Sequence, residues 1–127
     1  MTSSICRETK FIKTTINKAV FDGAFFMDVN FSQALRFKAM WFNTIFDNST
    51  FPNNFQMDRD FDGAGFRNCD LIFQQFRNLS PDDIFVDRSV TLPSLNRDRP
   101  EHWKSKKLSE KEFKKCHKDW LERTNRV

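Results

Sequence analysis

Residues 19–31 read AVFDGAFFMDVNF, and three phenylalanines recur in them at an interval of five, Phe21, Phe26 and Phe31. The same interval continues in both directions, so that most large apolar residues between positions 11 and 76 fall on it. An α-helix repeats about every 3.6 residues and a β-strand every two, and neither produces this interval. The pattern therefore predicts a chain that turns a corner after every five residues.

Each five-residue unit has a large apolar residue, which we call its centre, and a smaller residue two positions earlier. The centres fall at positions 11, 16, 21 and onward to 76, and twelve of these fourteen residues are apolar. Two typical units are Ala19-Val20-Phe21-Asp22-Gly23 and Ala64-Gly65-Phe66-Arg67-Asn68. Such short units bury their apolar residues only by stacking on one another, as the units of a repeat protein do.

This pattern resembles the pentapeptide-repeat family, whose unit reads small, polar, leucine or phenylalanine, and then two variable residues. The resemblance covers about residues 9–78. The segments 87–93 (DRSVTLP) and 99–103 (RPEHW) also resemble the continuation that often follows such repeats. The resemblance implies a right-handed, four-sided β-helix with about four units in each coil.

We therefore expect a β-solenoid, a quadrilateral β-helix of about four coils, followed by an extended segment and an amphipathic α-helix. The expected divisions are 1–8 for an N-terminal segment or cap, 9–85 for the pentapeptide-repeat β-helix, 86–107 for an extended tail and 108–127 for the C-terminal helix. Four units of five residues place side chains twenty positions apart above one another. Phe26, Phe46 and Phe66 should then touch in succession.

One column of this arrangement is irregular, because Arg36 and Gln56 occupy centre positions between Ile16 and Phe76. An isolated arginine inside a narrow core is costly, so we expect a local change of register that turns both polar residues outward. The apolar neighbours that would turn inward are Leu35 or Phe37, and Phe55 or Met57. Alternatively, the two polar residues line a functional groove.

Residues just before each centre should point to solvent, yet several of them are apolar. Stacking at intervals of twenty places Val20 beside Met40, and it places Phe25 beside Ile45. Clustered exposed apolar side chains often mark an interface. The candidate partner surface contains Val20, Phe25, Met40, Phe42 and Ile45, together with Arg36 and Gln56. Alternatively, the N-terminal segment or the C-terminal tail folds back over this surface.

A helix should begin after Ser109, because Ser109 and Glu112 have the spacing of a capping box. One apolar stripe then runs along that helix through Phe113, Cys116, His117, Trp120 and Leu121. We expect this stripe to pack on the last coil, where it would hide an open sheet edge, or to form a dimer with another chain. Lysines cover the other faces, which are either simply solvated or bind an acidic surface.

The charge of the chain is unevenly divided. The net charge is +4, but residues 1–85 carry 9 Lys and Arg against 10 Asp and Glu, whereas residues 86–127 carry 12 against 7. A nucleic-acid partner is therefore not expected for the body of the protein. The three cysteines lie far apart, which favours reduced thiols and a cytoplasmic protein over a zinc site or a disulfide framework. No apolar run is long enough to span a membrane.

The sequence contains no recognisable catalytic constellation, metal motif or phosphate-binding loop, and we expect neither an enzyme nor a cofactor. His102 and His117 should serve in packing or hydrogen bonding. The favoured function is a protein-binding or scaffold module whose partner is another protein or a second copy of itself, as a homodimer or a subunit of a larger assembly. The family resemblance also suggests an alternative, a DNA-mimicking modulator of gyrase, although that role requires an acidic outer surface.

Overall fold

The structure is a computed structural model of the chain. It describes residues 5–7, 15–20, 23–33, 36–53, 56–72, 75–92 and 99–126. For the segments 5–7, 15–20 and 36–38 it describes the backbone alone. Parallel sheets, two short 3-10 helices and an α-helix make up the regular structure of these residues.

The main sheet has strands in the order β1 (Ile5–Arg7), β3 (Phe25–Met27), β5 (Ile45–Asp47), β7 (Gly65–Arg67) and β9 (Phe85–Val86). Two smaller sheets pair β2 (Thr15–Val20) with β4 (Arg36–Met40) and β6 (Gln56–Met57) with β8 (Gln75–Phe76). Two short 3-10 helices, η1 (Arg59–Phe61) and η2 (Pro81–Asp83), precede the C-terminal helix α1 (Glu110–Arg123). All strand pairs are parallel, so the chain returns in the same direction each time.

The register of the main sheet is twenty residues throughout. Ile5 pairs with Phe25, Phe25 with Ile45, Ile45 with Gly65, and Gly65 with Phe85. This register confirms that residues twenty apart lie side by side. The sheet also begins at β1, ahead of residue 9 where the repeat was expected to start. Cys6 explains the earlier start, because it pairs with Phe26 as a further residue on the same interval.

The aromatic rings stack as this register requires. Ring centroids of Phe26 and Phe46 lie 5.5 Å apart at an interplanar angle of 12°, and those of Phe46 and Phe66 lie 5.3 Å apart at 14°. The predicted succession of these three rings is confirmed. Two further pairs stack in the same way, Phe31 with Phe51 and Trp41 with Phe61. The expected members Phe11 and Phe21 lie outside the described residues.

The irregular column shows the expected local change of register. Ile16 pairs with Phe37 instead of Arg36, and Phe76 pairs with Met57 instead of Gln56. Met57 is fully buried whereas Gln56 is exposed, which is the arrangement that the cost of burying a polar group favours. The register returns to twenty at Ala19 and Ala39, after a shift between positions 17 and 19 of β2.

The corners of the chain depend on residues that accept a left-handed backbone. Positive φ angles recur two residues after the centres, at Gly23, Asp28, Asn43, Asn48, Gly63, Asn68 and Asn78. Glycine, asparagine and aspartate tolerate this conformation better than other residues. Hydrogen bonds also join corners that lie twenty residues apart. The side chain of Asn48 donates to the Asp28 carboxylate at 2.6 Å.

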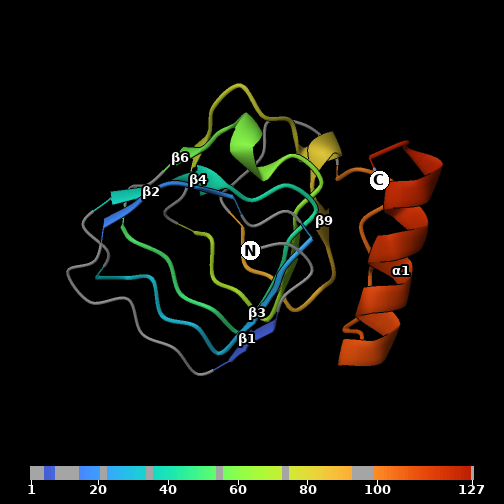
Figure 1. Ribbon diagram of the computed structural model, residues 1–127. Helices are drawn as coiled ribbons and strands as arrows, with labels where there is room; N and C mark the ends of the chain where they lie inside the picture. Colours follow the sequence, from blue (N-terminus) through green and yellow to red (C-terminus); the bar gives the residue numbers. More distant parts are fainter. Residues whose placement is uncertain are drawn as a thin grey trace.

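Two apolar clusters lie on opposite sides of the main sheet, because alternate residues of a strand point to opposite faces. Phe26, Phe46 and Phe66 belong to the inner cluster with most of the other rings. Phe25, Ile45 and other outward residues form a second cluster with α1. Figure 1 shows α1 standing outside the strands, alongside the main sheet. The helix therefore covers a sheet face.

The edge of the sheet at β9 is occupied by the extended segment that precedes α1. The amide of Lys104 donates to Val86 O at 3.0 Å, and the amide of Arg88 donates to Lys106 O at 3.3 Å. Trp103 anchors this segment, because it is buried and its indole N–H donates to Ile84 O at 3.2 Å. The prediction that the helix stripe would hide the open edge is wrong, since backbone pairing satisfies that edge directly.

Among the described residues, no helix is both long and apolar enough to cross a bilayer.

Candidate partner surface

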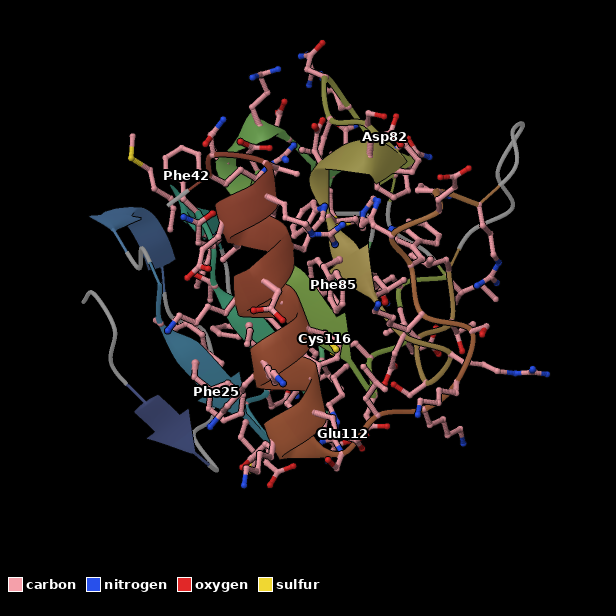
Figure 2. All side chains as sticks on the ribbon, turned by 90° about the vertical axis from the view of Figure 1, so that its right-hand side faces the viewer. Phe25, Phe42, Asp82, Phe85, Glu112 and Cys116 are labelled. Atoms are coloured by element: carbon pink, nitrogen blue, oxygen red, sulfur yellow. The ribbon has the colours of Figure 1, made fainter. Side chains whose placement is uncertain are left out.

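The apolar surface predicted on the outer side of the strands is largely covered. Phe25 pairs with Ile45 as expected, but their exposed fractions are only 7% and 8%. Figure 2 looks onto α1, which lies across the strands that carry Phe25 and Phe85. The interpretation of Phe25 and Ile45 as an exposed partner surface is therefore wrong, and the alternative in which the C-terminal tail folds back over them holds.

The stripe of α1 makes this contact. Phe113, His117, Trp120 and Leu121 are buried, and Cys116 is partly buried beside them. The rings of Phe85 and Phe113 meet edge to face, with centroids 5.2 Å apart. Because these side chains pack on the helix's own sheet, they are not available to pair with a second copy of the chain. The stripe serves as an intramolecular cover and not as a dimer surface.

Gly65 lets the helix approach the sheet closely. A Cβ atom at this position would lie 3.0 Å from His117 Cδ2 and 3.1 Å from Phe113 Cε1, which is closer than ordinary packing allows. The neighbouring outward positions carry the large side chains of Phe25, Ile45 and Phe85. Phe113 and His117 of α1 therefore occupy the space above Gly65, between the larger outward side chains of the neighbouring strands.

The remaining predicted residues differ in how far they are exposed. Met40 is 47% exposed, and Phe42 is partly buried. The backbones of Val20 and Met40 pair as expected, but the side chains of Val20 and Arg36 lie outside the described part of the structure. Gln56 is exposed and accepts a hydrogen bond from Arg77 at 3.1 Å. Among the described side chains of the predicted surface, Met40 keeps the largest apolar exposure.

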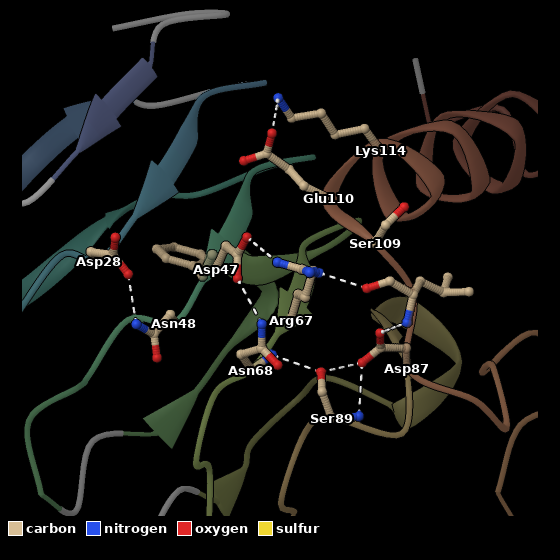
Figure 3. Close-up of polar contacts among 12 residues, drawn as sticks. Asp28, Asp47, Asn48, Arg67, Asn68, Asp87, Ser89, Ser109, Glu110 and Lys114 are labelled. Carbon is tan, nitrogen blue, oxygen red and sulfur yellow. Dashed lines mark hydrogen bonds and ion pairs between the residues drawn. The ribbon is translucent and has the colours of Figure 1, made fainter.

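Polar contacts hold the beginning of α1 against the sheet (Figure 3). Arg67 donates to the Asp47 carboxylate at 2.6 Å and to the Leu108 carbonyl at 2.9 Å. Asp87 accepts from the Leu108 amide at 2.7 Å and also bonds to Ser89. Asp47 and Asp87 are almost completely buried, so these charge-assisted bonds compensate for lost hydration.

A second set of contacts holds the end of the tail. Arg126 forms ion pairs with Asp62 at 3.2 Å and with Asp83 at 2.9 Å, and its guanidinium lies 4.8 Å from the centroid of the Trp120 ring. Its backbone carbonyl accepts a hydrogen bond from the Asn43 side chain at 2.6 Å. The helix is therefore fixed at both ends, which makes it an integral part of the fold.

His117 joins the middle of the helix to the sheet. Its Nε2 lies 2.7 Å from the Gly63 carbonyl, and its exposed fraction is 3%. Burial lowers the pKa of His117 to about 4, although the hydrogen bond to Gly63 acts in the opposite direction. The imidazole is therefore neutral near pH 7 and donates its Nε2–H to the carbonyl oxygen.

Acidification should weaken the protein through His117. The folded-state pKa of about 4 lies below the ordinary value of 6.5, so the contribution is fully present above pH 6.5 and is lost as the pH falls toward 4. The expected loss is about 3 kcal/mol in the free energy of unfolding. Urea unfolding followed by tryptophan fluorescence at several pH values would measure it.

His117→Gln is the matched variant for this measurement, because glutamine keeps an amide donor near Gly63 but does not titrate. The variant should lose distinctly less stability between pH 6.5 and pH 4 than the unmodified protein. Identical pH dependence in the two proteins would contradict the assignment. The pKa of His102 is also lowered by burial, but this contribution is common to both proteins.

The remaining reactive side chains have structural surroundings. His102 Nε2 bonds to the Ile84 carbonyl and Trp103 donates to the same oxygen, so both predicted histidine roles in hydrogen bonding are confirmed. Burial raises the pKa of the Cys69 thiol to about 12, which leaves it protonated and unreactive at neutral pH. Within the described ranges, no three His, Cys, Asp or Glu side chains gather as metal ligands would.

The polar contacts at the helix were not recognised from the sequence, although the sequence carries a signal for part of them. Asp47, Arg67 and Asp87 are separated by the same twenty residues as the rings, so opposite charges alternate in one column. That signal identifies Arg67 as a partner of Asp47. It does not identify Leu108 or Arg126, whose contacts join distant parts of the chain.

Comparisons with known proteins give no assignment: no family model matches this chain, and neither curated proteins nor solved structures gave a match.

Proposed function

We propose that the chain is a pentapeptide-repeat protein with a right-handed, four-sided β-helix, and that it works as a non-enzymatic protein-binding or scaffold module. The twenty-residue register and the stacked rings support the repeat architecture. The left-handed corner residues support it as well. A β-helix of this kind can present a fixed surface to a partner and needs no conformational change to bind it.

The contact surface in this proposal is the outer face of α1. Lys111, Lys115 and Lys118 follow one another at helical spacing on the side opposite the buried stripe, and all three are exposed. Within the described part of the chain, none of the three forms an ion pair, whereas Lys114 pairs with Glu110 at 3.8 Å. This row of unpaired lysines is the observation that carries the proposal.

The partner that fits this row is a protein with an acidic surface. Complementary charges steer two proteins together and set their orientation, and their effect falls as salt increases. The predicted apolar surface contributes little, because α1 covers Phe25 and Ile45. Self-association is a weaker candidate, since the buried stripe is already used within the chain.

The test compares two triple variants in a pull-down from the native host. Lys111→Glu, Lys115→Glu and Lys118→Glu together should abolish capture of the partner that the unmodified protein retains. The control is Arg59→Glu, Arg77→Glu and Arg88→Glu, which makes the same charge change at exposed positions away from α1. Equal capture by both variants would refute the proposed surface. Size-exclusion chromatography with light scattering would reveal a self-associated form.

The alternative of a DNA-mimicking gyrase modulator gains no support. It needs a strongly acidic outer surface, whereas residues 1–85 carry 9 basic against 10 acidic side chains. Inhibition of supercoiling, with gyrase subunits among the captured proteins, would favour it over the binding module. We retain the cytoplasm as the proposed compartment because burial of the Cys69 thiol suits a reduced protein.

A further inference from the structure

A hollow lies between the segment 99–104 and the last turns of α1. Its volume is about 970 Å³, and its lining includes the cationic side chains of Arg99, Lys104 and Arg123. A second hollow of about 560 Å³ adjoins α1 and shares Lys104 and Arg123 with the first. Two positive side chains from different parts of the chain therefore border both spaces.

Within the described part of the chain, these three cations have no anionic partner. Among the described residues, no ion pair joins Arg99, Lys104 or Arg123 to a carboxylate, although Arg126 nearby is paired with both Asp62 and Asp83. Arg99 is held with its guanidinium 5.9 Å from the centroid of the Trp103 ring. Guanidinium groups bind oxyanions through paired N–H donors, and a lysine adds a mobile positive charge.

We propose that this hollow binds a small oxyanion, the phosphate or carboxylate group of a low-molecular-weight ligand, through Arg99, Lys104 and Arg123. This site is separate from the lysine row of the proposed partner surface. If the hollow bound no anion, the proposed partner surface would not be affected, because the two proposals use different side chains.

His102 and Trp120 form one wall of the hollow. The His102 ring stacks on Trp120 at a centroid distance of 4.8 Å and an interplanar angle of 5°, and His102 is further held by its bond to Ile84 O. The Arg126 guanidinium also contacts Trp120, since it lies 4.8 Å from the ring centroid. The stacked rings therefore bound the hollow on one side, while the cationic side chains would contact the anion.

Two carboxylates limit what the site accepts. Glu101 and Asp82 also line the hollow, and they oppose the three cations. An anion bound by Arg99, Lys104 and Arg123 is attracted by these cations and repelled by the two carboxylates. Removing the Glu101 charge should therefore strengthen binding, whereas removing any of the three positive charges should weaken it.

The two histidines of the chain provide an internal comparison. His102 lines the hollow. Its pKa is lowered by burial and, to a smaller extent, by the positive charges of Arg126 and Arg123, while the hydrogen bond to Ile84 and the charge of Asp82 act in the opposite direction. An anion bound between the cations offsets their effect and raises the pKa of His102. His117 lies on the buried face of α1, bonded to the Gly63 carbonyl, and does not line the hollow, so its resonances should stay unchanged.

The experiment is an NMR titration of the full chain with pyrophosphate and, separately, with citrate. We expect a saturable shift of the His102 ring resonances and an upward displacement of its pKa with at least one of these ligands. Stronger binding of pyrophosphate would indicate a phosphate ligand, and stronger binding of citrate would indicate a carboxylate ligand. No saturable shift with either, or an equal shift at His117, would overturn the proposal.

Single substitutions complete the test. Lys104→Gln and Arg123→Gln should each weaken binding about tenfold, as expected for the loss of one charge-assisted contact. Glu101→Gln should tighten it about threefold. The control is Arg88→Gln, which removes an exposed positive charge that does not line the hollow. Equal loss in Arg88→Gln and Arg123→Gln would show that general charge attraction, and not this site, holds the anion.

Discussion

Replacing Phe46 by alanine should lower the free energy of unfolding by about 3–5 kcal/mol. Phe46 is completely buried, and its ring centroid lies between 5.2 and 6.1 Å from its aromatic neighbours. Those neighbours are Phe26, Phe31, Trp41, Phe51, Phe61 and Phe66. The parallel layers hold these rings in place through backbone pairing, so they have little freedom to close the cavity that alanine leaves.

Met40→Lys is the matched control for this experiment. Met40 is 47% exposed, so a polar side chain at its position should change stability by less than about 0.5 kcal/mol. Urea unfolding monitored by circular dichroism would measure both variants. A small loss in Phe46→Ala would mean that the ring column repacks freely. A large loss in Met40→Lys would mean that another segment covers this side chain.

Replacing Arg67 by methionine should cost about 3–5 kcal/mol, because it leaves the buried Asp47 carboxylate without its cation. Asp47 is 1% exposed, and the Asn68 side chain at 3.3 Å is a weaker partner than Arg67 at 2.6 Å. The substitution also removes the donor to the Leu108 carbonyl. The start of α1 should therefore loosen together with the sheet.

A double-mutant cycle separates the ion pair from the rest of this effect. Asp47→Leu combined with Arg67→Met removes both charges, and it should recover most of the stability lost in Arg67→Met alone. Lys114→Met serves as the comparison, because it breaks a half-exposed ion pair with Glu110 and should cost less than about 1 kcal/mol. Additive losses in the cycle would show that Asp47 and Arg67 do not depend on each other.

The interval of five residues, together with the four units per coil that the family resemblance implies, predicted the stacking of the rings. Once Phe26, Phe46 and Phe66 are placed twenty apart, parallel pairing brings them together whatever the outer residues are. Even the irregular column was predictable, because burying Arg36 or Gln56 is costly and an apolar residue stands beside each. The helix after Ser109 was predictable for a similar reason, since its capping box involves residues only three positions apart.

The place where the helix packs was not predictable in the same way. Phe25 and Ile45 were predicted to form a partner surface or to be covered by a terminal segment, and the stripe from Phe113 to Leu121 was predicted to pack on the last coil or on a second chain. The choice among these arrangements rests on contacts between residues far apart in the chain. Gly65 leaves room for His117, and Arg126 reaches Asp62 and Asp83.

The neighbours of the periodic residues follow mainly from the repeat, because each residue belongs to a short unit and four units per coil, as the family resemblance implies, place residues twenty apart side by side. No short-range sequence pattern specifies where the C-terminal helix packs. It follows from complementary shape and charge between α1 and one face of the sheet, and these properties exist only after the sheet has assembled. The register could therefore be read from the amino-acid order, while the covered face became visible only in three dimensions.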